Sequence, residues 1–169
     1  TPTPTATPAP KVKLSKCTAT VKSQVYTGKA LKPAITVKYG KVALKKGTDY
    51  TVSYANNRAV GTATVTLKGK GNYTGTVKKT FKIRVSLSKC VVTVKDQTYT
   101  GQALTPAPVV RYGSKTLKKG TDYTVSYSGN RVVGTATVTL VGKGNYTGTV
   151  KKTFRINPKA VKLSSVTGG

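Results

Sequence analysis

The sequence predicts an all-β protein made of two tandem, small antiparallel β-sandwich domains with no helix. Two observations carry this prediction. The first is an internal repeat, because the run 45–54 recurs unchanged as 118–127, a shift of 73 residues that also relates Cys17 to Cys90. The second is a period-2 alternation of apolar and polar residues along the chain, whereas no window has a convincing period of about 3.6.

The repeat divides the chain of 169 residues into two domains. Roughly three-quarters of the paired positions are identical, so the two domains should share one fold. We place the first domain at 14–84 and the second at 85–157. Residues 1–13 should be a Thr/Pro-rich linker, since alternating Thr and Pro favour extended chain over a packed core. Residues 158–169 should be a linker or the truncated start of a following module.

Alternating side chains define the expected strands. Each run places apolar residues on one face and Thr, Ser or Lys on the other, which is typical of a strand with one packed and one hydrated face. In the first domain the apolar sets are Cys17, Ala19 and Val21; Tyr50, Val52 and Tyr54; Ala63, Val65 and Leu67; and Phe81, Ile83 and Val85. Gly and Asn residues separate the runs. We therefore expect about five to seven short strands in each domain, arranged as an Ig-like sandwich of two sheets.

The composition is extremely basic, with 30 Lys and Arg residues, three acids and a formal net charge of +27. Such a charge attracts anionic polymers, and salt weakens the attraction. It fits anionic polysaccharide, cell-wall polymer and host glycan equally, and it predicts only non-specific binding to nucleic acid. We expect a monomer without a membrane span, because no apolar run reaches the necessary length. The chain has no initiator Met and should be part of a longer protein.

The residue types argue against an enzyme. General acid–base catalysis usually needs a group that titrates near neutral pH, and the chain has no His. The three acids, Asp49, Asp96 and Asp122, do not supply paired carboxylates for one site. One Cys and one or two Asp in each domain also fall short of a metal-ligand set. We therefore expect no catalytic residue, no metal and no cofactor.

Two pairs of equivalent residues have structural and chemical interpretations. Asp49 and Asp122 should be turn carboxylates that accept backbone N–H bonds or pair with a nearby Lys. The alternative is that they assist an autocatalytic Lys–Asn or Thr–Gln crosslink. Cys17 and Cys90 should be small buried hydrophobes with unreactive thiols, and no disulfide between them is expected.

Lysines with interleaved tyrosines form the candidate contact surface for an anionic polymer. Its residues are Lys45, Lys46, Lys70, Tyr73, Lys78 and Lys79 in the first domain, and Lys118, Lys119, Lys143, Tyr146, Lys151 and Lys152 in the second. A basic surface with an aromatic side chain can bind sugar or single-stranded nucleic acid. The alternative is a solvated strand face whose lysines protect edge strands from aggregation. The run 69–75 should be a hairpin turn, because it fits no phosphate-binding loop.

Several motifs resemble the YDG/MBG-type extracellular repeat of bacterial surface proteins. They are the runs 26–30, 47–54, 61–65 and 69–75 with Asn57, and their counterparts 99–101, 120–127, 134–138 and 142–148. One departure is that Thr27 and Thr100 stand where the family often has Asp. The resemblance implies a β-sandwich module without a catalytic role, placed beside other extracellular modules. The tail from Pro158 resembles the start of a fibronectin type III module.

The expected function is that of a non-enzymatic spacer or stalk in a bacterial protein that is secreted or displayed at the cell surface. It would position neighbouring domains away from the cell wall, since copying a module adds length. The alternative is a cationic adhesion module that binds anionic cell-wall polymer, mucin or another glycan. The two functions differ in whether the chain is retained on such polymers as salt rises.

Overall fold

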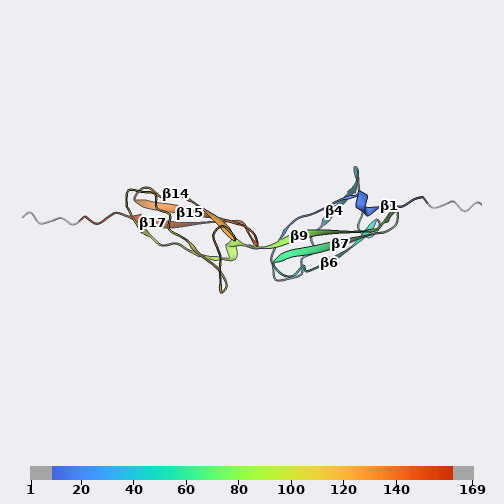
Figure 1. Ribbon diagram of the computed structural model, residues 1–169, viewed down its shortest axis with the longest axis horizontal. Helices are drawn as coiled ribbons and strands as arrows, with labels where there is room; N and C mark the ends of the chain where they lie inside the picture. The colour runs from blue at the N-terminus through green and yellow to red at the C-terminus, as the bar shows by residue number, and fades with distance from the viewer. Residues whose placement is uncertain (1–8, 162–169) are drawn as a thin grey trace, which may run out of the picture. The chain divides into compact units, whose positions relative to one another are not determined.

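The computed structural model describes residues 9–161; residues 1–8 and 162–169, which include parts of both predicted terminal linkers, lie outside the described residues. Within 9–161 the chain is all-β, with two single-turn 3₁₀ helices and no α-helix. The fold class predicted from the sequence is thereby confirmed. Two compact units meet at the peptide bond between Arg84 and Val85. Figure 1 shows long paired strands in both units.

The first unit consists of two sheets and one short parallel pair. Its elements are β1 (Val12–Lys13), η1 (Leu14–Lys16), β2 (Thr18–Val21), β3 (Gln24–Val25), β4 (Ile35–Tyr39), β5 (Val42–Ala43), β6 (Tyr50–Ala55), β7 (Gly61–Gly69), β8 (Tyr73–Thr74) and β9 (Thr76–Ser86). Strands β2, β4 and β5 form an antiparallel sheet. Strands β3, β9, β7 and β6 form a second sheet that curls into a half-barrel, and β1 pairs with β8 in parallel.

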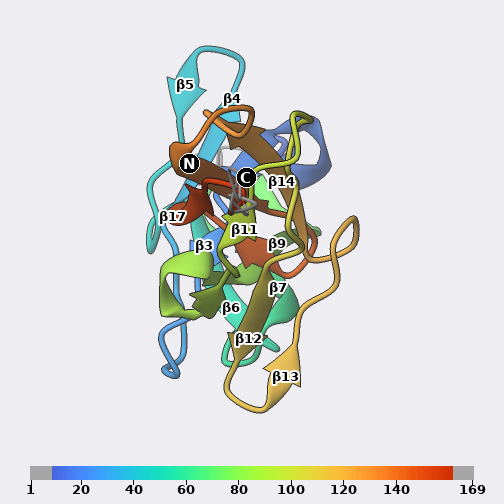
Figure 2. The same ribbon diagram turned by 90° about the vertical axis from the view of Figure 1, so that its left-hand side faces the viewer.

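The second unit repeats this arrangement. Its elements are η2 (Leu87–Lys89), β10 (Val91–Thr93), β11 (Gln97–Thr98), β12 (Val109–Tyr112), β13 (Lys115–Thr116), β14 (Tyr123–Ser128), β15 (Gly134–Gly142), β16 (Tyr146–Thr147) and β17 (Thr149–Asn157). Strands β10, β12 and β13 form the three-stranded sheet, and the β12–β13 hairpin is visible in Figure 2. The curled sheet has the order β11-β17-β15-β14.

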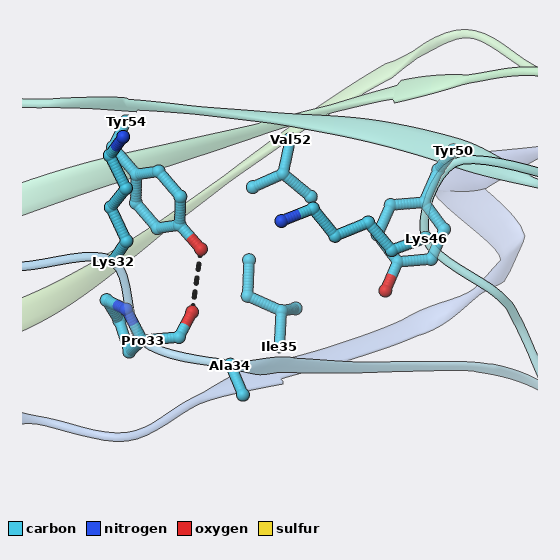
Figure 3. Close-up of a pocket in the computed structure, with 8 residues that line it drawn as sticks. All are labelled: Lys32, Pro33, Ala34, Ile35, Lys46, Tyr50, Val52 and Tyr54. Atoms are coloured by element: carbon cyan, nitrogen blue, oxygen red, sulfur yellow. Dashed lines mark hydrogen bonds between the residues drawn. The ribbon is translucent and has the colours of Figure 1, made fainter.

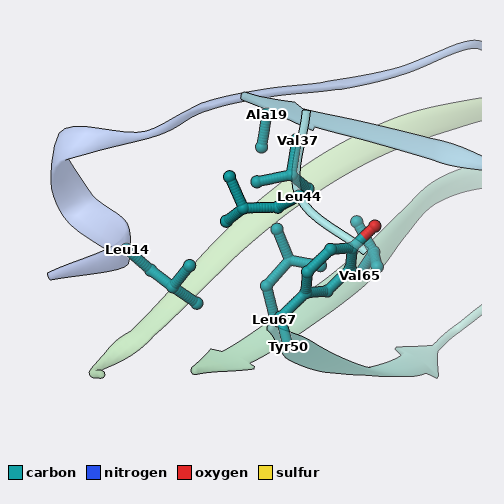
Figure 4. Close-up of a cluster of buried hydrophobic side chains, with 7 residues drawn as sticks. All are labelled: Leu14, Ala19, Val37, Leu44, Tyr50, Val65 and Leu67. Carbon is teal, nitrogen blue, oxygen red and sulfur yellow. The ribbon is translucent and has the colours of Figure 1, made fainter. Parts of the chain in front are cut away.

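The core of the first unit lies between its two sheets. Strands β2 and β4 contribute Ala19 and Val37, while β6 and β7 contribute Tyr50, Val65 and Leu67 from the opposite side (Figure 4). Ala19, Tyr50, Val65 and Leu67 belong to the apolar sets predicted from the sequence, Val37 does not, and each of the five is 9% exposed or less. Because side chains alternate across a strand, the Thr, Ser and Lys residues between the core positions face away from the core.

The parallel pairs were not predicted, since the sequence pattern indicated antiparallel sheets alone. Val12 and Lys13 fall in the stretch that the composition assigns to the linker, yet they pair with Tyr73 and Thr74 of β8. Likewise β3 runs parallel to β9, with Val25 opposite Arg84. Strands of two residues are too short to show a period-2 pattern, which is why composition alone did not reveal them.

Strand β9 continues from the first unit into the second. The carbonyl oxygen of Arg84 accepts a hydrogen bond from the Tyr26 N–H of the first unit at 2.8 Å. The next residue, Val85, donates its N–H to the Asn145 carbonyl oxygen of the second unit, also at 2.8 Å. The chain therefore leaves one unit and enters the other within a single strand.

Candidate functional site

The lysines proposed to contact an anionic polymer are all exposed, but they divide into two groups in each unit. In the first unit, Lys45, Lys46 and Lys70 lie in the loops that precede β6 and β8, whereas Lys78 and Lys79 lie on β9. The second unit places Lys118, Lys119 and Lys143 in the equivalent loops, and Lys151 and Lys152 on β17. We call residues 45–49 and 69–75, or 118–122 and 142–148, the loop pair of each unit.

Hydrogen bonds join the two halves of the loop pair. The Lys70 N–H donates to the Asp49 carbonyl oxygen at 2.9 Å, and the Lys70 ammonium donates to the Gly47 carbonyl oxygen at 2.7 Å. Lys143 makes the same two bonds, at 2.9 Å and 2.8 Å. These two lysines therefore stabilise the loop pair, and their ammonium groups are partly engaged within the protein.

The aspartates of the loop pair act as turn carboxylates, as the sequence predicted. Asp49 Oδ2 accepts the Lys45 N–H at 2.7 Å, and Asp122 Oδ2 accepts the Lys118 N–H at 2.9 Å. The alternative, a crosslink, needs a buried acid beside the reacting pair. Asp122 is buried and Asp49 is half-buried, and the Asn57 amide donates to the Leu31 carbonyl oxygen at 2.8 Å.

The predicted hairpin turn at 69–75 is confirmed. The Gly69 N–H donates to the Gly75 carbonyl oxygen at 2.8 Å, and strand β9 rather than a helix follows. Gly71 has a positive φ of 61°, and a Cβ at this position would lie 3.0 Å from the Thr48 carbonyl oxygen. Glycine here thus lets the two loops approach closely. The close approach accounts for the glycine at this position, and no phosphate-binding role is needed to explain it.

The paired lysines on β9 point to opposite sides of the curled sheet. Lys78 lies opposite Thr66 of β7, on the outer face. Lys79 is two residues from both Val77 and Phe81, so its side chain starts on the inner face that these two residues share. Lys79 remains exposed because the core does not extend over it. Adjacent lysines in the sequence therefore do not form adjacent charges on one surface.

The outer face of the curled sheet combines hydroxyl and cationic side chains. On β7, Thr62, Thr64 and Thr66 stand opposite Lys82, Thr80 and Lys78 of β9, and on β15, Thr135, Thr137 and Thr139 stand opposite Arg155, Thr153 and Lys151 of β17. The Lys82 ammonium donates to the Thr62 hydroxyl at 2.6 Å. The contact surface predicted from the sequence omitted Lys82 and Arg155. Each lies four residues after a lysine that the prediction included, Lys78 or Lys151, and the alternation of a strand places residues four apart on the same face.

The two tyrosines do not form exposed stacking platforms. Tyr146 is only 3% exposed, and the Lys115 ammonium lies 5.5 Å from the centre of its ring. Tyr73 is half-buried and packs against the core cluster of the first unit. This corrects the expectation that both rings would be available to a bound sugar or base.

The two thiols are free and half-buried, rather than fully buried as expected. Cys17 follows η1 and packs against the core cluster of the first unit, and Cys90 follows η2. Burial raises the pKa of both thiols above 9.0, so the protonated form is favoured. Within residues 9–161, no cluster of three or more His, Cys, Asp or Glu side chains could hold a metal ion.

A pocket of about 300 Å³ opens at the edge of the first unit, between β6 and the segment that leads into β4. Figure 3 shows Tyr50 at one end, Tyr54 at the other, and the side chain of Lys46 extended between them. The Tyr54 hydroxyl donates to the Pro33 carbonyl oxygen at 2.6 Å and closes that end. No sequence pattern indicated this pocket, of which only Lys46 was a candidate site residue, because its walls come from separate runs of the chain.

No family model matches the chain, and no curated protein is significantly similar to it. The described part of the chain also contains no helix that is long and apolar enough to cross a membrane.

Proposed function

We propose that this chain is a non-enzymatic spacer in a bacterial protein that is secreted or displayed at the cell surface, where it positions neighbouring domains. The continuity of strand β9 carries this proposal. Both Arg84 and Val85 have backbone groups engaged in hydrogen bonds, one in each unit. A change in the backbone angles between them would break bonds in one unit or the other, so the joint should resist bending.

The resemblance of the motifs to YDG/MBG-type repeats supports the proposed location outside the cell. Tandem copies of a small β unit are also typical of proteins in which repetition supplies length. Each unit has its own core, so such units can be joined in series without changing their internal packing.

The spacer function can be tested by the motion of one unit relative to the other. Residual dipolar couplings of the intact chain should fit one alignment tensor for both units. A variant with four Gly and Ser residues inserted between Arg84 and Val85 should require two tensors. The matched control carries the same insertion in the turn between β4 and β5, and it should still fit one tensor. Two tensors in the unmodified chain would rule out a stiff spacer.

A second candidate function is adhesion to an anionic cell-wall polymer or host glycan. The outer face of the curled sheet favours it, because exposed Lys and Arg side chains alternate there with Thr hydroxyls in both units. Such binding releases counterions and should weaken steeply as salt rises.

The adhesion function can be tested by retention on purified cell wall or heparin across a salt gradient. Replacing Lys78 and Lys82 with Gln should elute the chain at lower salt than the wild type. The control replaces Lys29 and Lys41, which changes the net charge equally at positions outside the outer face. Equal shifts in both variants would show that total charge, not the outer face, determines retention.

A further inference from the structure

The pocket of the first unit combines apolar walls, two cations and an available hydroxyl. Its lining residues are Lys32, Pro33, Ala34, Ile35, Lys46, Tyr50, Val52 and Tyr54. Pro33, Ile35 and Val52 present aliphatic surface, whereas Lys32 and Lys46 are exposed and supply positive charge. A volume of about 300 Å³ lies at the lower end of the range for ligand pockets and suits a single small ring.

The hydroxyl of Tyr50 is the most informative group in this pocket. Tyr50 is only 3% exposed, and its side chain lines the pocket. Its hydroxyl is not a fully buried atom without a partner, so water can reach it at the pocket wall. A ligand oxygen can replace this water and accept a hydrogen bond from the hydroxyl.

The second unit lacks the same combination of residues. Thr105 and Pro108 replace Lys32 and Ile35, although Lys119, Tyr123 and Tyr127 match the remaining side chains. The Tyr123 hydroxyl already donates to the Pro108 carbonyl oxygen at 3.5 Å. The second unit thus lacks the cation of Lys32, and its tyrosine hydroxyl lies 3.5 Å from a backbone carbonyl oxygen.

We propose that the pocket of the first unit binds the carboxylated ring of an acidic glycan, a sialic acid or a uronic acid. The Lys46 ammonium pairs with the carboxylate, and Lys32 adds positive charge at the rim. The Tyr50 hydroxyl donates to a ring oxygen, while Ile35 and Val52 pack against the aliphatic face of the sugar. This site is independent of the spacer function, and it differs from the outer face because it occurs in one unit and requires a ring.

The test is an NMR titration of the ¹⁵N-labelled intact chain at about 0.15 M NaCl, where surface electrostatics are screened. One arm uses N-acetylneuraminic acid and another uses galacturonic acid, which separates the two sources of a carboxylated ring. Galactose tests the need for charge, and inorganic phosphate tests the need for a ring. Shifts are expected at 32–35, 46 and 50–54 but not at 105–108, 119 and 123–127. Galactose and phosphate should bind at least about tenfold more weakly than the better acid.

Variants connect the binding to the named side chains. Lys46→Gln and Tyr50→Phe should each weaken binding by about tenfold, since a hydrogen bond to a charged group or a buried partner is lost. The matched controls Lys119→Gln and Tyr123→Phe should leave the affinity unchanged. The double substitution Thr105→Lys and Pro108→Ile should create a second site in the second unit. A spectrum that is otherwise unchanged confirms that each variant is folded.

Three results would overturn the proposal. The first is the absence of shifts at the pocket with either acid. The second is equal affinity for inorganic phosphate, which would indicate a simple anion site. The third is equal loss of binding in the Lys46→Gln and Lys119→Gln variants, which would indicate non-specific charge. None of these results would affect the dipolar-coupling test of the spacer function.

Discussion

At the scale of single residues, the carboxylates of Asp49 and Asp122 hold the turns that precede β6 and β14. Each accepts the N–H of the lysine four positions earlier. Asp122 is 8% exposed, whereas Asp49 is half-buried. We predict that Asp122→Ala lowers the free energy of unfolding by about 1–2 kcal/mol and that Asp49→Ala lowers it by less, because a deeper N–H is costlier to leave without an acceptor.

Asparagine provides the control for this prediction. Asp122→Asn keeps a side-chain oxygen that can accept the Lys118 N–H, so it should retain most of the stability. Urea unfolding, followed through NMR signals of the unit that carries the change, measures each effect. If Asp122→Asn and Asp122→Ala were equally destabilising, the hydrogen bond would not be the cause.

The thiols of Cys17 and Cys90 provide a prediction about reactivity. Burial raises the pKa of each above 9.0, which lowers the fraction of reactive thiolate at any given pH. At pH 8 both thiols should react with a disulfide reagent at least about tenfold more slowly than in the urea-unfolded chain. The rate should still be rising with pH above pH 9. A native rate equal to the unfolded rate would mean that neither thiol is protected.

At the scale of elements, the turn between β7 and β8 depends on close backbone approach. A Cβ on Gly69 would lie 2.6 Å from the Thr74 nitrogen, and Gly142 has the same relation to Thr147. We predict that Gly69→Ala lowers the free energy of unfolding of the first unit by about 2–4 kcal/mol, because backbone atoms must move to relieve the clash. Hydrogen exchange of the β7 and β9 amides measures the effect.

Gly40 is the matched control for this substitution. It lies in the turn between β4 and β5 with a positive φ of 58°, and a Cβ there would meet nothing within 4 Å. Gly40→Ala should therefore cost only backbone strain, about 1 kcal/mol. Equal effects at the two glycines would show that the clash at Gly69 is relieved without cost.

The longer elements could be predicted from the sequence because their side chains alternate. The apolar set of β7, namely Ala63, Val65 and Leu67, is buried as predicted, and so are Phe81 and Ile83 of β9. The two-residue parallel strands could not be predicted, since their pairing depends on how the ends of longer strands are placed. Period-2 reasoning works only where a strand is long enough to repeat.

The candidate contact surface was predictable in composition but not in arrangement. Lys78 and Lys79 are neighbours in the sequence, and the alternation of the strand separates them. Tyr146 stands in a turn motif that suggested exposure, yet it is buried beneath Lys115. The pocket at Tyr50 joins side chains from 32–35 and 46–54, and no local pattern relates these two runs.

At the scale of the whole molecule, two copies of one fold have diverged at a few positions. The shared residues are mostly those that build the sheets and turns, so both units keep the same topology. The difference at Lys32 removes a cation from the pocket lining, and the difference at Ile35 also shortens a strand, since β4 begins at Ile35 whereas β12 begins one position later, at Val109. Under the proposed binding, one copy of the repeat would carry a site that the other lacks.

The whole chain should lose stability on the alkaline side because each unit holds two buried or half-buried tyrosines at matching positions. Burial raises the pKa of Tyr50, Tyr54, Tyr123 and Tyr127 above 10.0, and the nearby Asp49 and Asp122 raise the pKa values of Tyr50 and Tyr123 further. The unfolded chain loses these protons near pH 10.0, whereas the folded chain retains them. The resulting stability is complete below this pH and is lost as pH rises through the raised values.

We therefore predict that the free energy of unfolding falls as pH rises above about 10, and that the double variant Tyr54→Phe with Tyr127→Phe shows a shallower fall. Phenylalanine keeps the edge-to-face packing of Tyr54 on Phe81, at 6.4 Å between ring centres, but has no proton to lose. Urea unfolding at several pH values from about 8 to 11 measures how steeply the free energy of unfolding falls with pH in the wild type and in the variant. Subtracting one slope from the other removes the contribution of every other titrating group. Identical slopes would mean that these phenols do not govern alkaline stability. The variant should be slightly less stable at pH 8, by about 1 kcal/mol for each hydroxyl, because the bonds to the Pro33 and Pro106 carbonyl oxygens are lost.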